Sequence, residues 1–161
     1  MHSRLLFLLL LLSTCLVLSS SASNPSAADA ELIQGVVLDS VPLLRSALAS
    51  GADIDRRDPT SGQTALMRAA LGGAAKAAAY LLDEGADASI PEKDGYTAIH
   101  GACFQGRPEV VRLLVARGVD VRGVHSDGYE AAFRATWGRL PRHAEALAVM
   151  ITMGGVPLDA G

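Results

Sequence analysis

His100 and Cys103 are the first residues in the sequence whose types and spacing suggest chemistry. They stand three positions apart in a segment that we predict to be helical, so both side chains would lie on one face. An imidazole and a thiolate suit zinc, but two ligands do not complete a zinc site. His125 and His143 show no matching spacing, and the only other cysteine is Cys15 near the amino terminus. We therefore predict no metal site and expect Cys103 to be a small buried residue.

Motifs of common catalytic sites are missing from the chain. The sequence has neither a phosphate-binding G-x-x-x-x-G-K-[ST] loop nor a G-x-S-x-G nucleophile elbow. Its acidic residues are scattered through predicted turns, where carboxylates more often cap helices than act as an acid and base pair. We expect no catalytic residues, no cofactor and no enzymatic activity. An enzyme remains an alternative, and its mark would be a pocket of convergent, buried polar groups.

The amino terminus has the pattern of a signal peptide. Arg4 supplies a positive charge, residues 5–18 form a nearly continuous apolar run, and small residues follow up to Ala22. The run is shorter than the ~20 residues that a transmembrane helix needs. We predict a signal peptide over residues 1–22, a short linker over residues 23–27, and entry into the secretory pathway or secretion. The alternative is an uncleaved anchor, in which residues 5–18 hold the protein at a membrane.

Charge and cysteine content limit the kinds of partner and the source of stability. Loss of Arg4 with the leader takes the basic residues from 14 to 13 against 17 acidic ones, so the net charge changes from -3 to -4. A mildly acidic chain has no electrostatic reason to bind nucleic acid or an anionic membrane. Cys15 would leave with the leader, so Cys103 could form no internal disulfide. Packing alone must then stabilise the fold.

Similar segments recur along the chain at equal intervals. GQTALMRAA begins at Gly62, GYTAIHGAC begins at Gly95, and GYEAAFRAT begins at Gly128. A second pair of landmarks, Gly85 in LLDEGAD and Gly118 in LLVARGVD, shows the same spacing. A period of about 33 residues is typical of a protein built from stacked structural repeats.

Each repeat has the signals of two short helices and a loop. Thr64 and Thr97 are suitable N-cap residues for a first, alanine-rich helix. Pro108 fits the first turn of a second helix, and Gly85 and Gly118 fit the carboxyl end of that helix. The predicted unit is therefore helix, turn, helix, loop.

These segments resemble the ankyrin repeat. TALMRA from Thr64 and TAIHGA from Thr97 are similar to the ankyrin signature T-P-L-H-x-A, whose period is also about 33 residues. Ala65 and Ala98 replace the usual proline of that signature. The resemblance covers about residues 28–155. It implies an all-α solenoid of about four repeats that binds another protein in its concave groove.

The resemblance also sets the expected domain boundaries. The terminal repeats are degenerate, as expected of solenoid ends, which have one neighbour each and present a more polar outer face. Extra residues near Leu140 and Pro141 lengthen the last repeat. The expected divisions are an ankyrin domain over 28–157, full repeats over about 59–91 and 92–124, caps over 28–55 and 125–157, and a tail over 158–161.

Residues that the repeat pattern does not dictate form the candidate binding surface. Leu71, Phe104 and Trp137 are spaced by the same repeat period, so the array should align them in one stripe, with Val37 as a counterpart. The resemblance implies that this stripe faces the concave groove. It also places Gln63, Tyr96 and Tyr129, which follow the turn glycines, beside the stripe. We expect Arg68 and Arg134 at the polar edge of the groove. The full candidate set is Gln63, Arg68, Leu71, Tyr96, Phe104, Tyr129, Arg134 and Trp137.

Two interpretations of the stripe stay open. Tyrosine and tryptophan dominate binding hot spots, and Arg134 could lie over the indole of Trp137 and keep it available for contact. Alternatively, the stripe packs between helices as core. We expect Tyr80 and Phe133 to be core residues in either case.

The sequence thus predicts a non-catalytic, monomeric module that binds another protein, whose identity it does not reveal. The alternative is a small non-catalytic scaffold subunit of a larger complex, which an uncleaved leader could anchor to a membrane.

The leader gives the first testable prediction. Mass spectrometry of the protein purified from expressing cells should find a mature amino terminus near Ser23, because the small residues before it suit signal peptidase. An intact Met1 in a cytosolic protein would contradict the prediction. An intact Met1 in a membrane-bound protein would instead favour the anchor.

Overall fold

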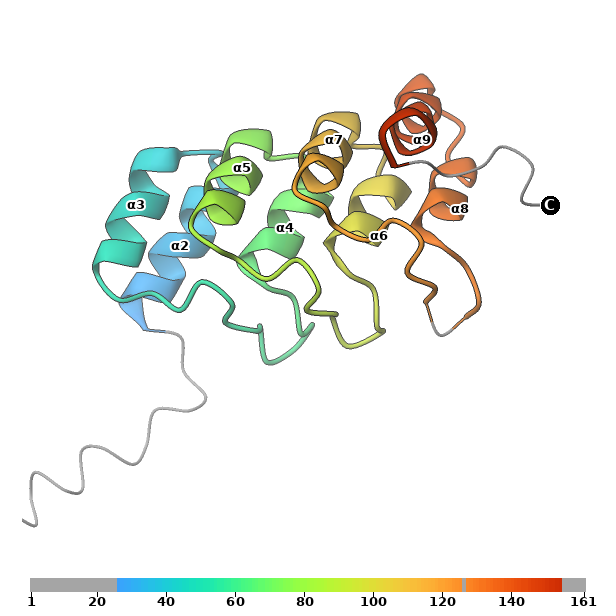
Figure 1. Ribbon diagram of the computed structural model, residues 1–161. Helices are drawn as coiled ribbons and strands as arrows, with labels where there is room; N and C mark the ends of the chain where they lie inside the picture. Colours follow the sequence, from blue (N-terminus) through green and yellow to red (C-terminus); the bar gives the residue numbers. More distant parts are fainter. Residues whose placement is uncertain (1–25, 126, 155–161) are drawn as a thin grey trace, which may run out of the picture.

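The computed structural model describes residues 26–125 and 127–154. Over these residues the chain forms four helix pairs, one for each expected repeat (Figure 1). The predicted signal peptide and the tail lie outside the described residues. Among those described, no helix is long and apolar enough to cross a membrane. The helices are α2 (Ala27–Val37), α3 (Val41–Ala49), α4 (Ala65–Gly72), α5 (Ala75–Asp83), α6 (Ala98–Phe104), α7 (Pro108–Ala116), α8 (Ala131–Thr136) and α9 (Pro141–Gly154).

The helix boundaries follow from the capping residues in the sequence. The hydroxyl of Thr64 accepts a hydrogen bond from the N–H of Met67 at 3.3 Å and so caps α4. Gly73 ends that helix with a φ of 80°, a left-handed conformation that glycine adopts without steric cost. Pro108 lies in the first turn of α7. The N-cap and first-turn proline expected from the sequence are therefore confirmed.

The helix pairs stack into two rows. The first helices α2, α4, α6 and α8 form one row, and the second helices α3, α5, α7 and α9 form the other (Figure 1). Contacts join neighbours within each row and the two helices of each pair. The result is an all-helical solenoid, as the repeat pattern predicted. The extra residues expected near Leu140 and Pro141 are not in the connection between α8 and α9, because Pro141 keeps the repeat period from Pro108. They lengthen the last helix instead, since α9 has 14 residues and α7 has 9.

Small residues let the helices approach closely. Ala69, Ala102 and Ala135 occupy equivalent positions in successive repeats and are all buried. Larger side chains such as Leu114 fill the space between rows. Cys103 is fully buried, and its Sγ donates to the Sδ of Met150 at 3.0 Å.

Burial also fixes the chemistry of the one free cysteine of the described chain. It raises the pKa of the Cys103 thiol to about 12. The reactive species of a cysteine is the thiolate. Cys103 therefore stays protonated at neutral pH and acts as a small apolar residue, as its position in the repeat predicted.

Side-chain carboxylates join the loops of adjacent repeats. Asp29 accepts a hydrogen bond from the N–H of Asp53 at 3.0 Å, and Asp55 accepts one from the N–H of Asp87 at 3.0 Å. The backbone N–H of Lys93 also donates to a loop carbonyl of the preceding repeat at 3.1 Å. The acidic residues therefore support turns, as expected from their positions.

The packing predicts a large difference between two leucine truncations. Leu114→Ala should lower the free energy of unfolding by about 2–5 kcal/mol, because it leaves a cavity between the rows. Leu140→Ala is the matched control, since Leu140 is 48% exposed, and should change that free energy by less than about 0.5 kcal/mol. Urea denaturation followed by circular dichroism measures both values. Equal losses would contradict the described core.

Candidate protein-binding groove

The predicted stripe lies along the row of first helices. Leu71 belongs to α4, Phe104 to α6, and Trp137 follows directly after α8. Phe104 is 49% exposed and Trp137 is 50% exposed, whereas Leu71 is partly buried. Half-exposed aromatic rings do not fill a core, so the packing interpretation does not describe Phe104 and Trp137. Whether they bind a partner remains a prediction.

A pocket of about 350 Å³ lies between these residues. Its walls come from the second, third and fourth repeats together. Six of the eight candidate residues line it: Gln63, Leu71, Tyr96, Phe104, Arg134 and Trp137. Arg68 instead lines a neighbouring hollow beside Val37, and Tyr129 contacts Trp137 outside the pocket lining.

One residue of the pocket lining, Gly101, has no side chain. Gly101 lies one repeat period after Arg68 and one before Arg134, and therefore occupies the same place in the middle repeat. A Cβ atom at Gly101 would lie 3.0 Å from the Cδ2 of Leu71 and 3.3 Å from the Sδ of Met67. Leu71 and Met67 therefore pack closely against Gly101, and together they form an apolar floor of the pocket.

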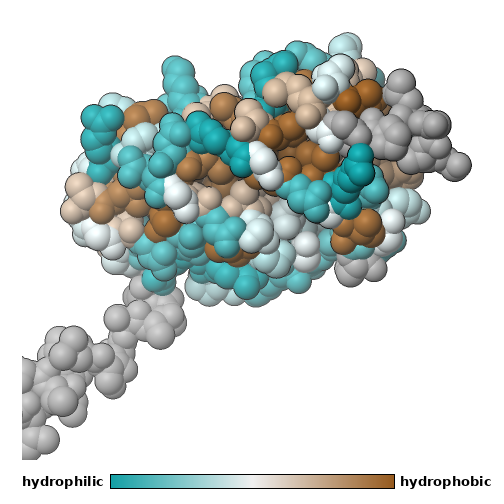
Figure 2. Space-filling view, viewed as in Figure 1, coloured by the Kyte–Doolittle hydropathy of each residue, from teal (hydrophilic) through white to brown (hydrophobic). Residues whose placement is uncertain are grey.

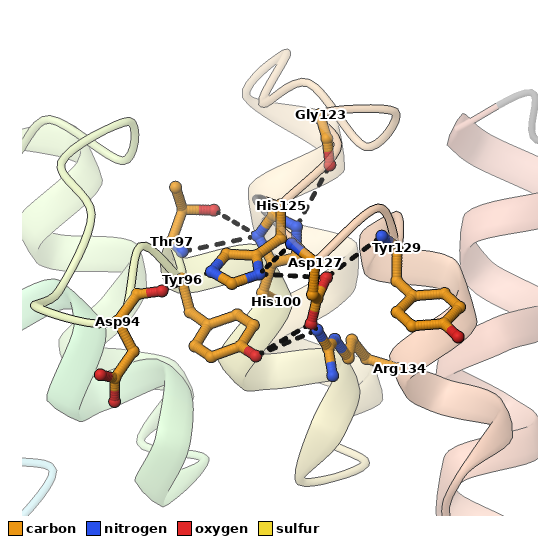
Figure 3. Close-up of polar contacts among 9 residues, drawn as sticks. All are labelled: Asp94, Tyr96, Thr97, His100, Gly123, His125, Asp127, Tyr129 and Arg134. Atoms are coloured by element: carbon orange, nitrogen blue, oxygen red, sulfur yellow. Dashed lines mark hydrogen bonds and ion pairs between the residues drawn. The ribbon is translucent and has the colours of Figure 1, made fainter.

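Arg134 is the central polar side chain of the site. It is 4% exposed, so the prediction that it stands at the polar edge of the groove is wrong. Its Nη2 pairs with Asp127 and donates to the hydroxyl of Tyr96 at 3.1 Å (Figure 3). Its guanidinium carbon lies 4.6 Å from the ring centre of Trp137 and 4.7 Å from that of Tyr96. The predicted contact with the indole is confirmed, and the rings on either side explain the burial.

Asp127 holds this arrangement together. Partial burial raises its pKa, but the contacts with Arg134, His125 and the N–H of Tyr129 outweigh burial and hold the pKa well below its usual range. Asp127 also accepts from the hydroxyl of Tyr96 at 3.1 Å. The carboxylate is therefore charged at neutral pH and compensates the buried guanidinium.

Three buried histidines lie where the fourth repeat meets the third. Each brings its Nε2 to a backbone carbonyl, which for His125 and His143 belongs to the third repeat and for His100 to the loop that leads into the fourth. Since a carbonyl only accepts, Nε2 carries the proton. The pairs are His100 with Gly123 at 3.2 Å, His125 with Asp94, and His143 with Phe104 at 3.1 Å. These bonds position the repeat that supplies Arg134 and Trp137. Figure 3 shows His100 and His125 beside Arg134.

Comparison with known proteins establishes the family of this repeat array. A family model described as ankyrin repeats in three copies matches residues 32–125, more than half of the chain. This chain belongs to the ankyrin-repeat family. Ankyrin repeat and SAM domain-containing protein 6 of Mus musculus is 37% identical over 65 residues, and that of Rattus norvegicus is 36% identical over the same length. Each match covers 40% of this chain but only 7% of the relative.

The ankyrin register explains why one core expectation is wrong. Phe133 occupies the position of Met67 and His100, which are 2% and 5% exposed because the next repeat covers them. No further repeat follows α9 within the described part of the chain, and Phe133 is 41% exposed. It stacks on Tyr129 with ring centres 4.4 Å apart. The more polar outer face expected of the last repeat is therefore not found at this position.

The expectation that Tyr80 belongs to the core agrees with the structure. Tyr80 is partly buried and packs against the core. His100 and Cys103 make separate contacts, with the backbone of Gly123 and with Met150 respectively. Within residues 26–125 and 127–154, no three potential metal ligands gather.

Sequence reasoning missed Glu92, Gly101 and Asp127. Glu92 lines the pocket and Asp127 pairs with Arg134, although both stand in loops that looked like ordinary turns. Gly101 gave a signal, since a glycine stood between two arginines in the repeat register. Asp127 gave a weaker one, because Asp94 occupies the equivalent position in the preceding repeat.

The histidine contacts predict acid sensitivity. Burial lowers the pKa of His100 below its usual value of 6.5, and the positive charge of Arg134 lowers it further, against the hydrogen bond to Gly123. Near and below pH 6.5, His100 therefore binds a proton more readily in the unfolded chain than in the folded protein. The stabilisation is present above pH 6.5 and is lost as the pH falls below it, by at most about 1.4 kcal/mol per pH unit.

His100→Met tests this expectation with a residue that the fold already accepts, because Met67 occupies the same position one repeat earlier. The free energy of unfolding, measured in urea at pH 7.5 and at pH 5, should decrease less between these two pH values in His100→Met than in the natural protein. This range lies above the titration of Asp127. Identical acid dependence in the two proteins would show that His100 is not responsible.

Proposed function

We propose that this ankyrin array is a non-catalytic module that enters the secretory pathway and holds a partner protein in the groove along α4, α6 and α8. Ankyrin repeats are a protein–protein interaction module, which supports the general function. The proposal goes further by assigning the contact to the pocket between Leu71, Phe104 and Trp137.

The exposure of Phe104 and Trp137 carries this proposal. Large aromatic side chains are normally buried, and exposed ones fixed in place make effective hot spots. Trp137 is held by Arg134 on its face and by contacts with Tyr129 and Phe133 at its edge. A ring that is already fixed loses little side-chain entropy when a partner binds.

The proposed secretory route rests on the leader pattern of residues 1–22. It is compatible with the buried and protonated state of Cys103, which would need no disulfide partner in an oxidising compartment. Anchoring by an uncleaved leader remains the alternative route.

A second candidate function is a small scaffold subunit of a larger complex, and one surface favours it. Tyr129, Phe133, Trp137 and Leu140 expose apolar area at the end of the array. Apolar surface also reaches solvent in separate patches on the face shown in Figure 2. A free binder should remain a monomer in size-exclusion chromatography with light scattering, whereas a lone subunit should self-associate or aggregate.

The groove assignment predicts a separation between binding and stability. After a partner has been identified by affinity purification, Phe104→Ala and Trp137→Ala should each weaken binding at least about thirtyfold, the effect of a hot spot worth roughly 2 kcal/mol. Both side chains are half exposed, so the melting temperature should change little. Titration calorimetry and thermal denaturation measure the two quantities.

Met153→Ala is the matched control, because Met153 is exposed to a similar degree but does not line the pocket. It should leave groove binding unchanged. Early melting of Phe104→Ala and Trp137→Ala with normal partner affinity would overturn the groove function. Loss of binding only in Phe133→Ala would instead support the scaffold subunit.

A further inference from the structure

The pocket in the groove has an unbalanced negative charge. Arg134, the cation in its lining, is paired with Asp127. Glu92, the anion in its lining, accepts a hydrogen bond from the amide of Gln63 at 3.1 Å. Among residues 26–125 and 127–154, no cation lies within ion-pair distance of Glu92. A partner can therefore compensate the charge of Glu92 by bringing a positive group to it.

The interior of the same pocket selects against a positive group. Its floor is formed by Met67, Leu71 and the backbone of Gly101. The guanidinium of Arg134 already lies over the faces of Tyr96 and Trp137. A second cation inside would meet an apolar floor and a like charge, so the interior suits an uncharged, apolar group.

We propose that the pocket receives one large apolar side chain of the partner, from a segment that also places a lysine or arginine side chain against Glu92. This inference rests on the proposed function and specifies the chemistry of the partner. The volume of about 350 Å³ lies near the lower end of the roughly 300–1,000 Å³ of ligand pockets. It therefore fits a side-chain anchor better than a large ligand.

The charge of the surrounding loops agrees with this assignment. Asp94 and Asp127 lie in the loops that precede α6 and α8, and Asp58 lies in the loop that precedes α4. The carboxylate of Asp58 accepts from the backbone of Thr60 and Ser61 and pairs with Arg68 at 3.0 Å. Arg68 and Arg134 compensate Asp58 and Asp127. The loop that precedes α6 instead has a net negative charge, with Glu84, Asp87, Glu92 and Asp94 against the single cation Lys93. This charge attracts a basic segment to the groove before contact.

A peptide library tests the inference even before the natural partner is identified. The protein purified from expressing cells is used to select from a displayed library of random peptides. Enriched peptides should combine one large apolar residue with a lysine or arginine a few positions away. Synthetic copies of one such peptide, with the basic residue kept or replaced by glutamate, then serve as probes in calorimetry.

Three variants separate the two halves of the proposal. Phe104→Ala should weaken binding of the peptide that keeps its basic residue at least about thirtyfold. Glu92→Gln keeps an acceptor for the Gln63 amide and should weaken it by about two- to fivefold, as expected for a partly exposed ion pair. Glu92→Lys should reverse the preference between the two peptides, so that the variant binds the glutamate peptide more tightly than the basic one. Glu109→Gln, on an exposed residue of α7, is the matched charge control and should have no effect.

The outcomes distinguish this inference from the function on which it rests. Binding that needs Phe104 but ignores the charge at position 92 overturns the basic segment and leaves the groove function standing. Binding that ignores both residues, or a library that yields no peptide dependent on Phe104, overturns the pocket as an anchor site. Loss of natural-partner binding in Phe104→Ala would in that case still support the groove. Reversal of preference in Glu92→Lys, with Glu109→Gln unchanged, supports the inference.

Discussion

The structure depends on one constraint: a single helix pair of this length cannot bury its own apolar face. Each pair contributes small residues such as Ala69 and Ala102, and only the neighbouring pair removes them from water. Stability is therefore shared along the array. Residues at the ends of the array, and residues that do not pack against a neighbouring repeat, can therefore differ from one repeat to the next. The pocket and the exposed aromatic residues occur at such positions.

The fourth repeat shows how the array combines a buried charge with a binding surface. A buried guanidinium without a charge partner would be strongly destabilising, so Arg134 requires Asp127, and aromatic rings lie against it. The same rings are the walls of the pocket. Loss of Asp127 would therefore disturb both the packing of the last repeat and the shape of the groove, and the histidine contacts with the third repeat reinforce this coupling.

The sequence predicted what depends on period and capping, and it failed where contacts cross between repeats. Thr64, Pro108 and the turn glycines are local signals, so the helix pairs and the stripe of Phe104 and Trp137 could be placed from spacing alone. The burial of Arg134 could not, because it depends on Asp127 in a loop and on Tyr96 one repeat earlier. The role of Glu92 was equally hidden, since a carboxylate in a turn resembles any other until its neighbours are known.

The position shared by Met67, His100 and Phe133 explains why function must be sought in departures from the repeat. In the second repeat, Met67 packs against Gly101 of the third. In the third, His100 bonds to the carbonyl of Gly123, in the loop that leads into the fourth. In the fourth, the same position carries an exposed phenylalanine. One backbone position thus serves packing, inter-repeat docking or exposed surface, depending on whether a neighbour covers it. The fold alone therefore specifies a binding scaffold, and under the proposed function the side chains at uncovered positions, such as Phe104 and Trp137, select the partner.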